Sequence, residues 1–595
     1  MFTYQSLIAQ SVYHESVEPF AYAYRGDLYL RLRIGTQLVD CVEVVHFDKF
    51  QPTAPKVTTP AFLYAKDGTT HDIYQAQLTR DSKRFKYFFV LHVGQATYCY
   101  SRLGVTDSEP PGPEDTFEVP YLGERDTYQP PAWTIGTTYY QIFPERFHRG
   151  TTKKVDRRKL TKWDAIPTTT SFFGGNLQGV IEKLDYLSDL GVEVIYCTPI
   201  FKAPSNHKYD TVDYFAIDPH FGSEDDLRTL VDESHKRDMK VVLDAVFNHM
   251  GMKHPIFQDL LQNAENSKYA SWIYAKSWPL SLKTRNYETF GYIPSMPKWR
   301  TAAPEVEEYL CQIGEYWVAK TGIDGWRLDV SDEVEHTFWK HFRTRIKSLN
   351  PDALICGEIW QVATPWLRGD EFDSVMNYPF ARAVLQWLAT QSIDAYAFSA
   401  QIEQIRIRYP EPVLPTLWNL LDSHDTPRLL TECDEDKRQA MLASFMQFTA
   451  VGSPVLYYGD EVGMTGGPDP LCRGGMIWDE GQQDQELLIH YKTLLTLRKH
   501  YRALREGSFR PAFSGHSRQL YAFVRILNDA ATKTPQETIV CFVNNQKHEI
   551  RLQFLDPNIP TGVYACIYGA RKGEQIDTRQ GLTLPGKSAS MWLLK

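Results

Sequence analysis

The sequence lacks the features that mark disulfide-bonded, zinc-binding, membrane-spanning and secreted proteins. Its nine cysteines are scattered singly along 595 residues without a C-x-x-C pair, which favours reduced thiols over a disulfide framework or a zinc site. No run of about 18 apolar residues occurs, so we expect no transmembrane helix. The first 20 residues have neither the basic nor the apolar region of a secretory signal. The reduced thiols favour a cytoplasmic protein.

Charge and glycine pattern argue against two further classes of protein. The net charge of −9 disfavours nucleic acid and anionic membranes as partners, because both are bound chiefly by basic patches. No G-x-G-x-x-G motif opens a helix after the first strand expected beyond residue 133, which weakens a dinucleotide-binding interpretation. What remains is an ordinary globular composition, with 43% hydrophobic and 23% charged residues, in a chain long enough for two to four domains.

Residues 1–120 are predicted to form an N-terminal β-sandwich. In "DLYLRLRI", residues 27–34, Leu28 and every second residue after it are apolar and should point inward, whereas Arg31 should point outward. "RFKYFFVLHV" is a second strong strand candidate. Residues 107–131 are rich in Pro, Gly and acidic residues, which indicates a linker at the end of this domain.

Short apolar strands then alternate with amphipathic helices over roughly 370 residues. Helices are expected over residues 177–190, ending at Gly191, and after Ser223, a plausible N-cap. The eight strand candidates are "TTYYQIF", "VEVIYCTPIF", "VVLDAVFNH", "GIDGWRLDV", "ALICGEIW", "SVMNYPF", "TLWNLLDSHD" and "SPVLYYGDEVG". This alternation fits an α/β fold with a closed (β/α)₈ TIM barrel better than an open doubly wound sheet.

The domain organisation follows from this pattern. The barrel is expected to occupy residues 121–249 and 304–506, and the long, aromatic, irregular stretch 250–303 should be a subdomain inserted after the third strand. Strand patterns return in residues 507–595 and predict a C-terminal β-sandwich.

Polar residues gather at the carboxyl ends of the expected barrel strands. These ends converge on the face where TIM barrels place their catalytic groups. Any single Asp there could simply cap a helix, and any single His could be structural. A purely structural explanation would require polar residues to arise separately at each of four strand ends, which we consider a poor explanation of the whole set. The set comprises Asp244, Asn248, His249, Arg327, Asp329, Glu358, Trp360, His424 and Asp425.

Three carboxylates from three strands suit glycoside hydrolysis. One carboxylate attacks the anomeric carbon or activates water, another protonates the leaving oxygen, and further groups hold the distorted sugar. An arginine two residues before Asp329 should favour its ionised form, since a nearby positive charge lowers a carboxylate pKa.

Four short motifs carry a family resemblance. "DAVFNH", "GWRLDVSDE", "GEIW" and "LLDSHD" resemble, in order and in position, the motifs of the α-amylase superfamily, the retaining glycosidases of glycoside hydrolase family 13. The N-terminal β-domain, "MPKWR" from Met296 and "FFGGNLQGVIEKLDYLSDLG" are similar to its neopullulanase, cyclomaltodextrinase and maltogenic amylase subfamily. The resemblance spans essentially the whole chain.

The resemblance implies a role for each matching residue. Asp329 would be the nucleophile, Glu358 the general acid/base and Asp425 the stabiliser of the transition state. The substrate-binding set would comprise Arg327, His249, His424, Tyr209, Asp244, Asp469, Arg473, Glu333, Trp360 and Trp299. Trp299 stands where the subfamily usually has Leu, and Asp332 stands where Asn is common.

A further departure concerns calcium. Family members often have a calcium loop rich in Asn and Asp after "ERF", but here the sequence is "ERFHRGTTKKVDRRKL", and Asn176 replaces an expected carboxylate. Calcium requires several hard oxygen ligands. We therefore expect no cofactor and an empty or degraded calcium site.

Function and partners are likewise implied by the resemblance. It predicts hydrolysis of α-1,4 bonds in cyclodextrins, pullulan and maltooligosaccharides, with some transglycosylation, by a homodimer formed through the N-terminal domain. An ordinary endo-α-amylase, an α-glucan transferase and a non-catalytic carbohydrate-binding protein are the alternatives. The sequence leaves open the preferred substrate, activity on α-1,6 bonds, the ratio of hydrolysis to transfer, the oligomeric state and the role of Asp332.

Overall fold

The computed structural model describes residues 4–79, 82–123, 127–151, 160–512, 519–529, 532, 534–553 and 556–595. The chain forms two compact units, neither of which is continuous in sequence. The first contains Met1–Gln129, Val362–Asp370 and Ser399–Leu414, and the second contains Pro130–Gln361, Glu371–Phe398 and Pro415–Lys595. Two late segments of the chain therefore belong with the N-terminal unit.

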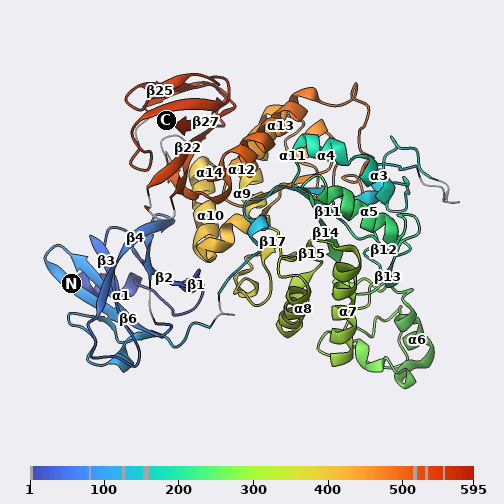
Figure 1. Ribbon diagram of the computed structural model, residues 1–595, viewed down its shortest axis with the longest axis horizontal. Coiled ribbons are helices and arrows are strands. Elements are labelled where there is room, and N and C mark those ends of the chain that lie inside the picture. The colour runs from blue at the N-terminus through green and yellow to red at the C-terminus, as the bar shows by residue number, and fades with distance from the viewer. Residues whose placement is uncertain are drawn as a thin grey trace. The chain divides into compact units, whose positions relative to one another are not determined.

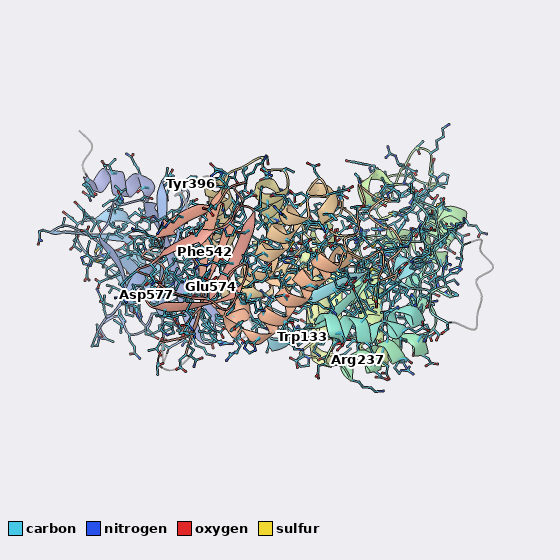
Figure 2. All side chains as sticks on the ribbon, turned by 90° about the horizontal axis from the view of Figure 1, so that it is seen from above. Trp133, Arg237, Tyr396, Phe542, Glu574 and Asp577 are labelled. Carbon is cyan, nitrogen blue, oxygen red and sulfur yellow. The ribbon has the colours of Figure 1, made fainter. Side chains whose placement is uncertain are left out.

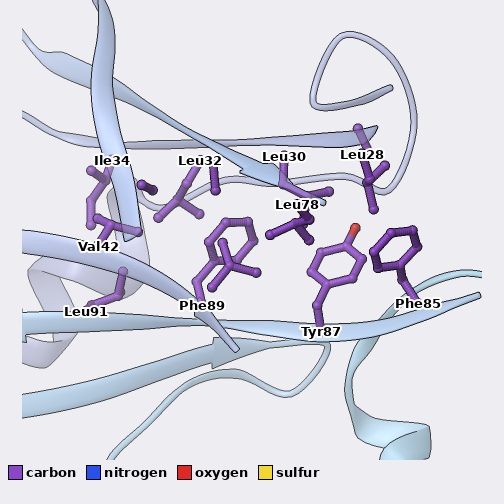
Figure 3. Close-up of a cluster of buried hydrophobic side chains, with 14 of the residues drawn as sticks. Leu28, Leu30, Leu32, Ile34, Val42, Leu78, Phe85, Tyr87, Phe89 and Leu91 are labelled. Carbon is purple, nitrogen blue, oxygen red and sulfur yellow. The ribbon is translucent and has the colours of Figure 1, made fainter. Parts of the chain in front are cut away.

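The first unit is built on an antiparallel sheet that folds around one apolar core. The strand order is β1-β2-β5-β4-β3-β6-β7-β8, with β9 paired to β6. The alternate residues of β2 that begin at Leu28 are buried, as predicted, and lie opposite Phe85, Tyr87 and Phe89 of β6 (Figure 3). The elements are α1 Tyr4–Ser11, β1 Ala21–Tyr24, β2 Asp27–Gly35, β3 Cys41–Phe47, β4 Val57–Asp67, β5 His71–Leu78, β6 Phe85–Val93, β7 Ala96–Ser101, β8 Gly104–Thr106 and β9 Phe117–Val119.

Arg31 lies on the other face of β2, but it is not exposed as predicted. Only 1% of its surface reaches solvent, because residues 399–414 cover it. Its Nη1 donates to the carbonyl oxygens of Ile407 at 3.0 Å and Tyr409 at 2.8 Å, and its Nε donates to Gln75 Oε1 at 2.8 Å. The guanidinium also lies 4.2 Å from the ring centroid of Tyr64. A segment distant in sequence thus buries a charged side chain.

The predicted linker, residues 107–131, is partly integrated into this unit. Its strand β9 pairs with β6 through the register Phe85 to Val119, and Val119 is buried in the core. The Pro-rich and acidic composition indicated a linker. It gave no signal for the short strand β9, which pairs with β6.

The second unit contains eight parallel strands that close into a ring. Their order is β17-β16-β15-β14-β11-β10-β19-β18, and a parallel bridge between Met376 and Trp418 joins the two ends. Each of the eight predicted segments contains one strand. The bounds are β10 Tyr139–Ile142, β11 Val194–Cys197, β14 Lys240–Ala245, β15 Gly325–Leu328, β16 Leu354–Gly357, β17 Ser374–Val375, β18 Trp418–Asn419 and β19 Ser453–Tyr457.

Helices cover the outside of the ring, and α7 and α8 pack side by side beside β14 and β15 (Figure 1). In the described residues, no helix combines the length and the apolar character needed to cross a membrane. The bounds are α2 Pro144–Phe147, α3 Leu177–Glu182, α4 Leu184–Leu190, α5 Glu224–His235, α6 Pro255–Asn263, α7 Pro304–Thr321, α8 His336–Leu349, α9 Tyr378–Val384, α10 Ala395–Arg408, α11 Leu429–Glu432, α12 Lys437–Thr449, α13 Gln485–His500 and α14 Arg502–Glu506.

Capping residues in the sequence predicted two helix ends correctly, but the sequence pattern did not predict the division of one helix. Ser223 caps α5 in a capping box with Asp226, and Gly191 ends α4 in the left-handed conformation, both as predicted. The helix expected over residues 177–190 is divided at Lys183, whose backbone leaves the helical region. Its ammonium lies 4.2 Å from the ring centroid of Trp478. That contact between distant residues is invisible to helical periodicity.

Residues 250–303 lie between β14 and α7 and are mostly irregular. They contain α6 and three short 3₁₀ turns, and isolated bridges such as Ile273 to Trp299 connect them. Two small strands, β12 Phe201–Lys202 and β13 Asp213–Ile217, pair with each other elsewhere in the unit.

The chain ends in a six-stranded sheet, in the order β20-β21-β22-β27-β24-β25, with a separate pair β23-β26. Phe542 is buried on β22 in this sheet (Figure 2). Arg525, also fully buried, donates to the carbonyl of Thr449 on α12 at 2.7 Å, which ties the sheet to the ring. The bounds are β20 Ser508–Ala512, β21 Leu520–Asn528, β22 Pro535–Asn544, β23 Ile550–Gln553, β24 Val563–Tyr568, β25 Gln575–Asp577, β26 Gly581–Leu584 and β27 Ser588–Leu594.

Candidate active site

The predicted site residues follow the carboxyl ends of neighbouring strands. Asp329 comes directly after β15, Glu358 directly after β16, and Asp244 lies near the end of β14. These three strands are adjacent and parallel, and Asp244 pairs in register with Arg327. Their polar side chains therefore meet at one rim of the ring.

Arg327 joins three carboxylates from these strands. Its Nη1 donates to Asp329 Oδ1 at 2.8 Å and to Asp244 Oδ2 at 3.0 Å. Its Nη2 forms an ion pair with Glu358 Oε2 at 2.8 Å. All four side chains are buried, and Arg327 is completely inaccessible. One cation thus orients the predicted nucleophile and the predicted general acid/base together.

The electrostatics differ from the expectation that Arg327 would lower the pKa of Asp329. Burial raises the pKa of Asp329 well above its usual value; Arg327 opposes this, whereas Glu358 and Asp244 add to it. Burial likewise raises the pKa of Asp244 to about 6, again against the effect of Arg327. Three buried carboxylates share one guanidinium, so desolvation outweighs the attraction.

The backbone turns sharply after Asp329. The strand candidate "GIDGWRLDV" extended to Val330, but β15 ends at Leu328 and Val330 has a φ of 47°. This left-handed turn directs the Val330 N–H to Glu358 Oε2 at 3.0 Å. Glu358 therefore has a backbone donor that side-chain patterns cannot reveal.

Trp360 forms an exposed aromatic surface beside Glu358. Its Nε1 donates to Glu358 Oε1 at 3.2 Å, and its ring stacks on Tyr378, with 3.9 Å between centroids and 10° between planes. Trp360 is 43% exposed, so one flat apolar face is available to a ligand. Tyr378 was not singled out in the sequence.

A chain of hydrogen bonds runs from Gln141 to Asp244. Gln141 Nε2 donates to His424 Nδ1 at 2.8 Å, and His424 Nε2 lies 2.7 Å from the hydroxyl oxygen of Tyr209. Tyr209 in turn donates to Asp244 Oδ2 at 3.0 Å, and Tyr196 donates to the same oxygen at 2.6 Å. Because Tyr209 donates its own proton to Asp244, the hydrogen bond between Tyr209 and His424 must use a proton on His424 Nε2.

Both predicted histidines are neutral in this environment. Burial lowers the pKa of His424 well below its usual value and that of His249 to about 3. His249 Nε2 lies 3.1 Å from the carbonyl oxygen of Tyr209, and its ring lies nearly parallel to Phe290. Gln141 was missed in the sequence, although an amide within a fully buried strand was a detectable signal.

Asp425 is held by Arg473 from the loop after β19. Arg473 Nη2 donates to Asp425 Oδ1 at 3.2 Å, its Nη1 lies 3.0 Å from Asp469 Oδ1, and its Nε donates to the carbonyl of His424 at 2.7 Å. Burial raises the pKa of Asp425, against the effect of Arg473. Arg473 thus brings the predicted residues Asp425, Asp469 and His424 together.

The segment "MPKWR" holds one predicted residue and buries another. Lys298 donates to the carbonyl of Glu333 at 2.7 Å and also contacts its carboxylate, so Glu333 is fixed near the rim while its side chain remains about half exposed. The structure argues against the predicted substrate contact of Trp299. Its ring is completely buried, and its Nε1 donates to Tyr214 Oη at 3.3 Å.

Asn176 has a structural role at the start of α3. Its Oδ1 accepts hydrogen bonds from the backbone N–H groups of Gly179 at 2.8 Å and Gly150 at 3.2 Å, and it caps α3. Residues 152–159 of the predicted basic segment lie outside the described residues. Within the described ranges, no three His, Cys, Asp or Glu side chains are grouped to hold a metal ion.

The sequence and the structure are both similar to those of known proteins. Residues 141–486 match the model of the alpha amylase catalytic domain, and residues 7–123 match the alpha amylase N-terminal ig-like domain. A cyclomaltodextrinase from Bacillus sp is 44% identical over 92% of this chain and 97% of its own length. Neopullulanase 2 from Thermoactinomyces vulgaris is 41% identical over 98% and 100%. A solved structure of a cyclomaltodextrinase is 41% identical, with a TM-score of 0.90 over 98% of this chain and 99% of that one. With residues 7–123 and 141–486 matched by models of this family and relatives aligned over nearly the full length, this chain belongs to the α-amylase family of glycosidases.

Proposed function

We propose that this protein hydrolyses α-1,4-glucosidic bonds of cyclodextrins, pullulan and maltooligosaccharides with retention of anomeric configuration. The observation that carries the proposal is the contact of Arg327 with both Asp329 and Glu358, which come from adjacent strands. Retaining glycosidases need a nucleophile and an acid on neighbouring positions of one site.

In the first step, Asp329 attacks the anomeric carbon and forms a β-glucosyl ester. Glu358, in its protonated form, transfers its proton to the leaving glycosidic oxygen as the carbon–oxygen bond breaks. Arg327 supports Asp329 in its ionised, nucleophilic form, because it is the cation closest to this buried carboxylate.

In the second step, water attacks the anomeric carbon that is bound to Asp329. Glu358, now ionised, takes the proton from water, and the bond to Asp329 breaks to regenerate the carboxylate. Asp425 would stabilise the positive charge that develops on the sugar in both steps. Its orientation by Arg473 supports this role.

The remaining side chains are proposed to bind sugar on both sides of the cleaved bond. His424, Tyr209 and His249 would line the subsite of the cleaved residue, and Asp469 would contact sugars toward the non-reducing end. The neutral state of the histidines suits hydrogen bonding to sugar hydroxyls, which needs no charge. The exposed face of Trp360 would stack on the sugar of the leaving group.

The substrate class is supported by the cyclomaltodextrinase and neopullulanase among the relatives. Rates and products on β-cyclodextrin, pullulan and soluble starch, measured in parallel, test it. We expect β-cyclodextrin to be cleaved faster than starch, with initial release of α-anomers detectable by proton NMR. A starch-selective profile would indicate an ordinary endo-α-amylase, and β-anomeric products would contradict retention.

We further infer the finer organisation of the protein. The eight-stranded ring would be a complete (β/α)₈ barrel, residues 250–303 an inserted subdomain, and the N-terminal domain the contact surface of a homodimer. Nine free cysteines, eight of them buried, favour a reducing, cytoplasmic location. Light scattering tests the dimer, since a monomeric mass at assay concentration would refute it.

We also propose that no calcium ion is needed for stability. The use of Asn176 Oδ1 by two backbone donors supports this, because an oxygen already engaged in two hydrogen bonds is a poor metal ligand. Calorimetry with and without EDTA should give the same Tm. A loss of several degrees with EDTA, reversed by calcium, would contradict the proposal.

A further inference from the structure

A fully buried arginine lies next to the segment that carries Asp425. Arg428 is three residues further along the chain, at the start of α11, and none of its surface is exposed. Its guanidinium carbon lies 4.4 and 4.8 Å from the ring centroids of Tyr457 and Tyr458, at the end of β19.

The hydrogen bonds of Arg428 connect three segments of the chain. Nη1 donates to the carbonyl of Tyr458 at 2.8 Å and to Asp460 Oδ1 at 2.9 Å, which fixes the residues after β19. Nε donates to the carbonyl of Cys472 at 3.0 Å, and its backbone N–H donates to the carbonyl of Gly466 at 2.9 Å. These last two bonds hold both ends of the loop 466–472.

This loop leads directly to the residue that orients Asp425. Arg473 follows Cys472, donates to Asp425 Oδ1 at 3.2 Å and donates to the carbonyl of His424 at 2.7 Å. The Cys472 thiol also donates to the His424 carbonyl, at 3.2 Å. A shift of the Cys472 carbonyl would therefore be passed to Arg473 within one residue.

A buried acid pair closes the network on its other side. Asp460, which accepts from Arg428, is also hydrogen-bonded to Asp422, and Asp422 Oδ2 accepts from the backbone N–H of Leu429 at 2.8 Å. Two carboxyl groups can hydrogen-bond only if one of them is protonated. Burial raises the pKa of both groups, which is consistent with a shared proton. The segment before Asp425 is thereby tied to the same arginine.

We infer that Arg428 is a positioning residue for the proposed hydrolysis: by fixing the carbonyls of Tyr458 and Cys472, it holds Arg473 in contact with Asp425. The inference rests on the proposed function, because it gives Arg473 and Asp425 a part in the reaction. Misplacing a group by about 1 Å can cost about 100-fold in rate. An arginine with a purely structural role would affect stability and leave kcat unchanged.

The chain offers a matched control in Arg498. It is also completely buried and also donates to backbone carbonyls, those of Gly136, Phe448 and Gly452. These carbonyls precede β10 and β19, so they lie at the opposite end of the strands from Asp425. R498M and R428M each remove one buried guanidinium, but only R428M removes the side-chain donor to the Cys472 carbonyl, at the end of the loop 466–472.

The experiment compares kcat and KM for β-cyclodextrin with the Tm of each variant. We expect R428M to lower kcat about 100-fold, with R428K retaining part of the activity, whereas R498M lowers Tm with kcat within about 3-fold of wild type. R428K combined with R473K should lose little more activity than the more impaired single variant, because both act through one contact. A folded R428M with the kcat of R498M, or fully additive losses in the double variant, would overturn the inference.

Two further measurements keep the inference testable. If R428M does not fold, D460A removes the carboxylate bound by Arg428, and wild-type kcat in both folded R428K and folded D460A would overturn the inference. Wild type is assayed first on β-cyclodextrin, pullulan and starch. Absence of all three activities refutes the proposed function and the inference with it, whereas an active wild type with an unaffected R428M refutes the inference alone.

Discussion

Replacing Asp329 with Asn should abolish turnover without weakening the fold. Asp329 is 5% exposed, and burial raises its pKa well above the usual value despite Arg327. Its ionised form is therefore less favourable in the folded than in the unfolded chain, by about 1.4 kcal/mol for each unit by which the pKa is raised. The variant removes this cost, and Arg327 keeps Asp244 and Glu358 as partners.

We expect the Tm of D329N at pH 7 to equal or exceed that of wild type, by roughly 2–4 °C for each kcal/mol regained. We expect kcat for β-cyclodextrin to fall at least about 10⁴-fold, as in enzymes that lose a nucleophile. Calorimetry and a reducing-sugar assay measure the two effects. D332N is the matched control, because Asp332 is an exposed acid in the same loop.

Either of two results would refute this reasoning. Turnover of D329N close to that of wild type would remove Asp329 from the reaction. A Tm lower by several degrees would show that the carboxylate stabilises the fold, against the direction of its pKa shift. An activity loss in D332N as large as that in D329N would mean that the assay detects disturbance of the loop as a whole.

Three other outcomes are expected. Asp244 has a pKa of about 6 when folded and 3.8 when unfolded, so the folded state binds more protons between these values and its stability falls as pH rises from about 4 to about 6. D244N lacks this dependence, and its Tm relative to wild type should rise over that range; a flat difference would contradict the assignment. R31M should lower the free energy of unfolding by about 3 kcal/mol in urea titrations, because Gln75 and two carbonyls lose their donor; a change below about 0.5 kcal/mol would mean that these bonds contribute little. W299L should lower stability by about 3 kcal/mol but leave KM for β-cyclodextrin unchanged, since the ring is buried; a several-fold increase in KM would restore a substrate contact for Trp299.

The sequence predicted the ring of strands and the central carboxylates because both depend on local signals. Each strand is a short apolar run with a turn after it, and the parallel arrangement brings the residues after these runs to one rim. Asp329 and Glu358 follow their strands directly, so locating the strands also located these two carboxylates. The family motifs then supplied candidate roles that spacing alone could not.

The misplaced residues depend on contacts between distant parts of the chain. Arg31 was expected in solvent, but residues near Ile407 cover it. Trp299 lies in a segment that pairs with Asn248 and His249, a few residues after β14, and its ring is buried in the interior. Val330 contributes a backbone N–H in a left-handed turn, which no side-chain pattern encodes. Whether an amphipathic side chain is buried, and where a backbone N–H points, can be determined only from the tertiary structure.

The first unit includes segments that are distant in sequence, and this limits how the chain can be shortened. Residues Ser399–Leu414, which include most of α10, bury Arg31 and accept its hydrogen bonds. A truncation before residue 130 would expose these carbonyls and the apolar side of that segment, although the cut lies some 270 residues earlier in the sequence. The N-terminal domain therefore depends on residues 399–414 for its folded structure, and transferring it to another catalytic domain would require this segment to be transferred as well.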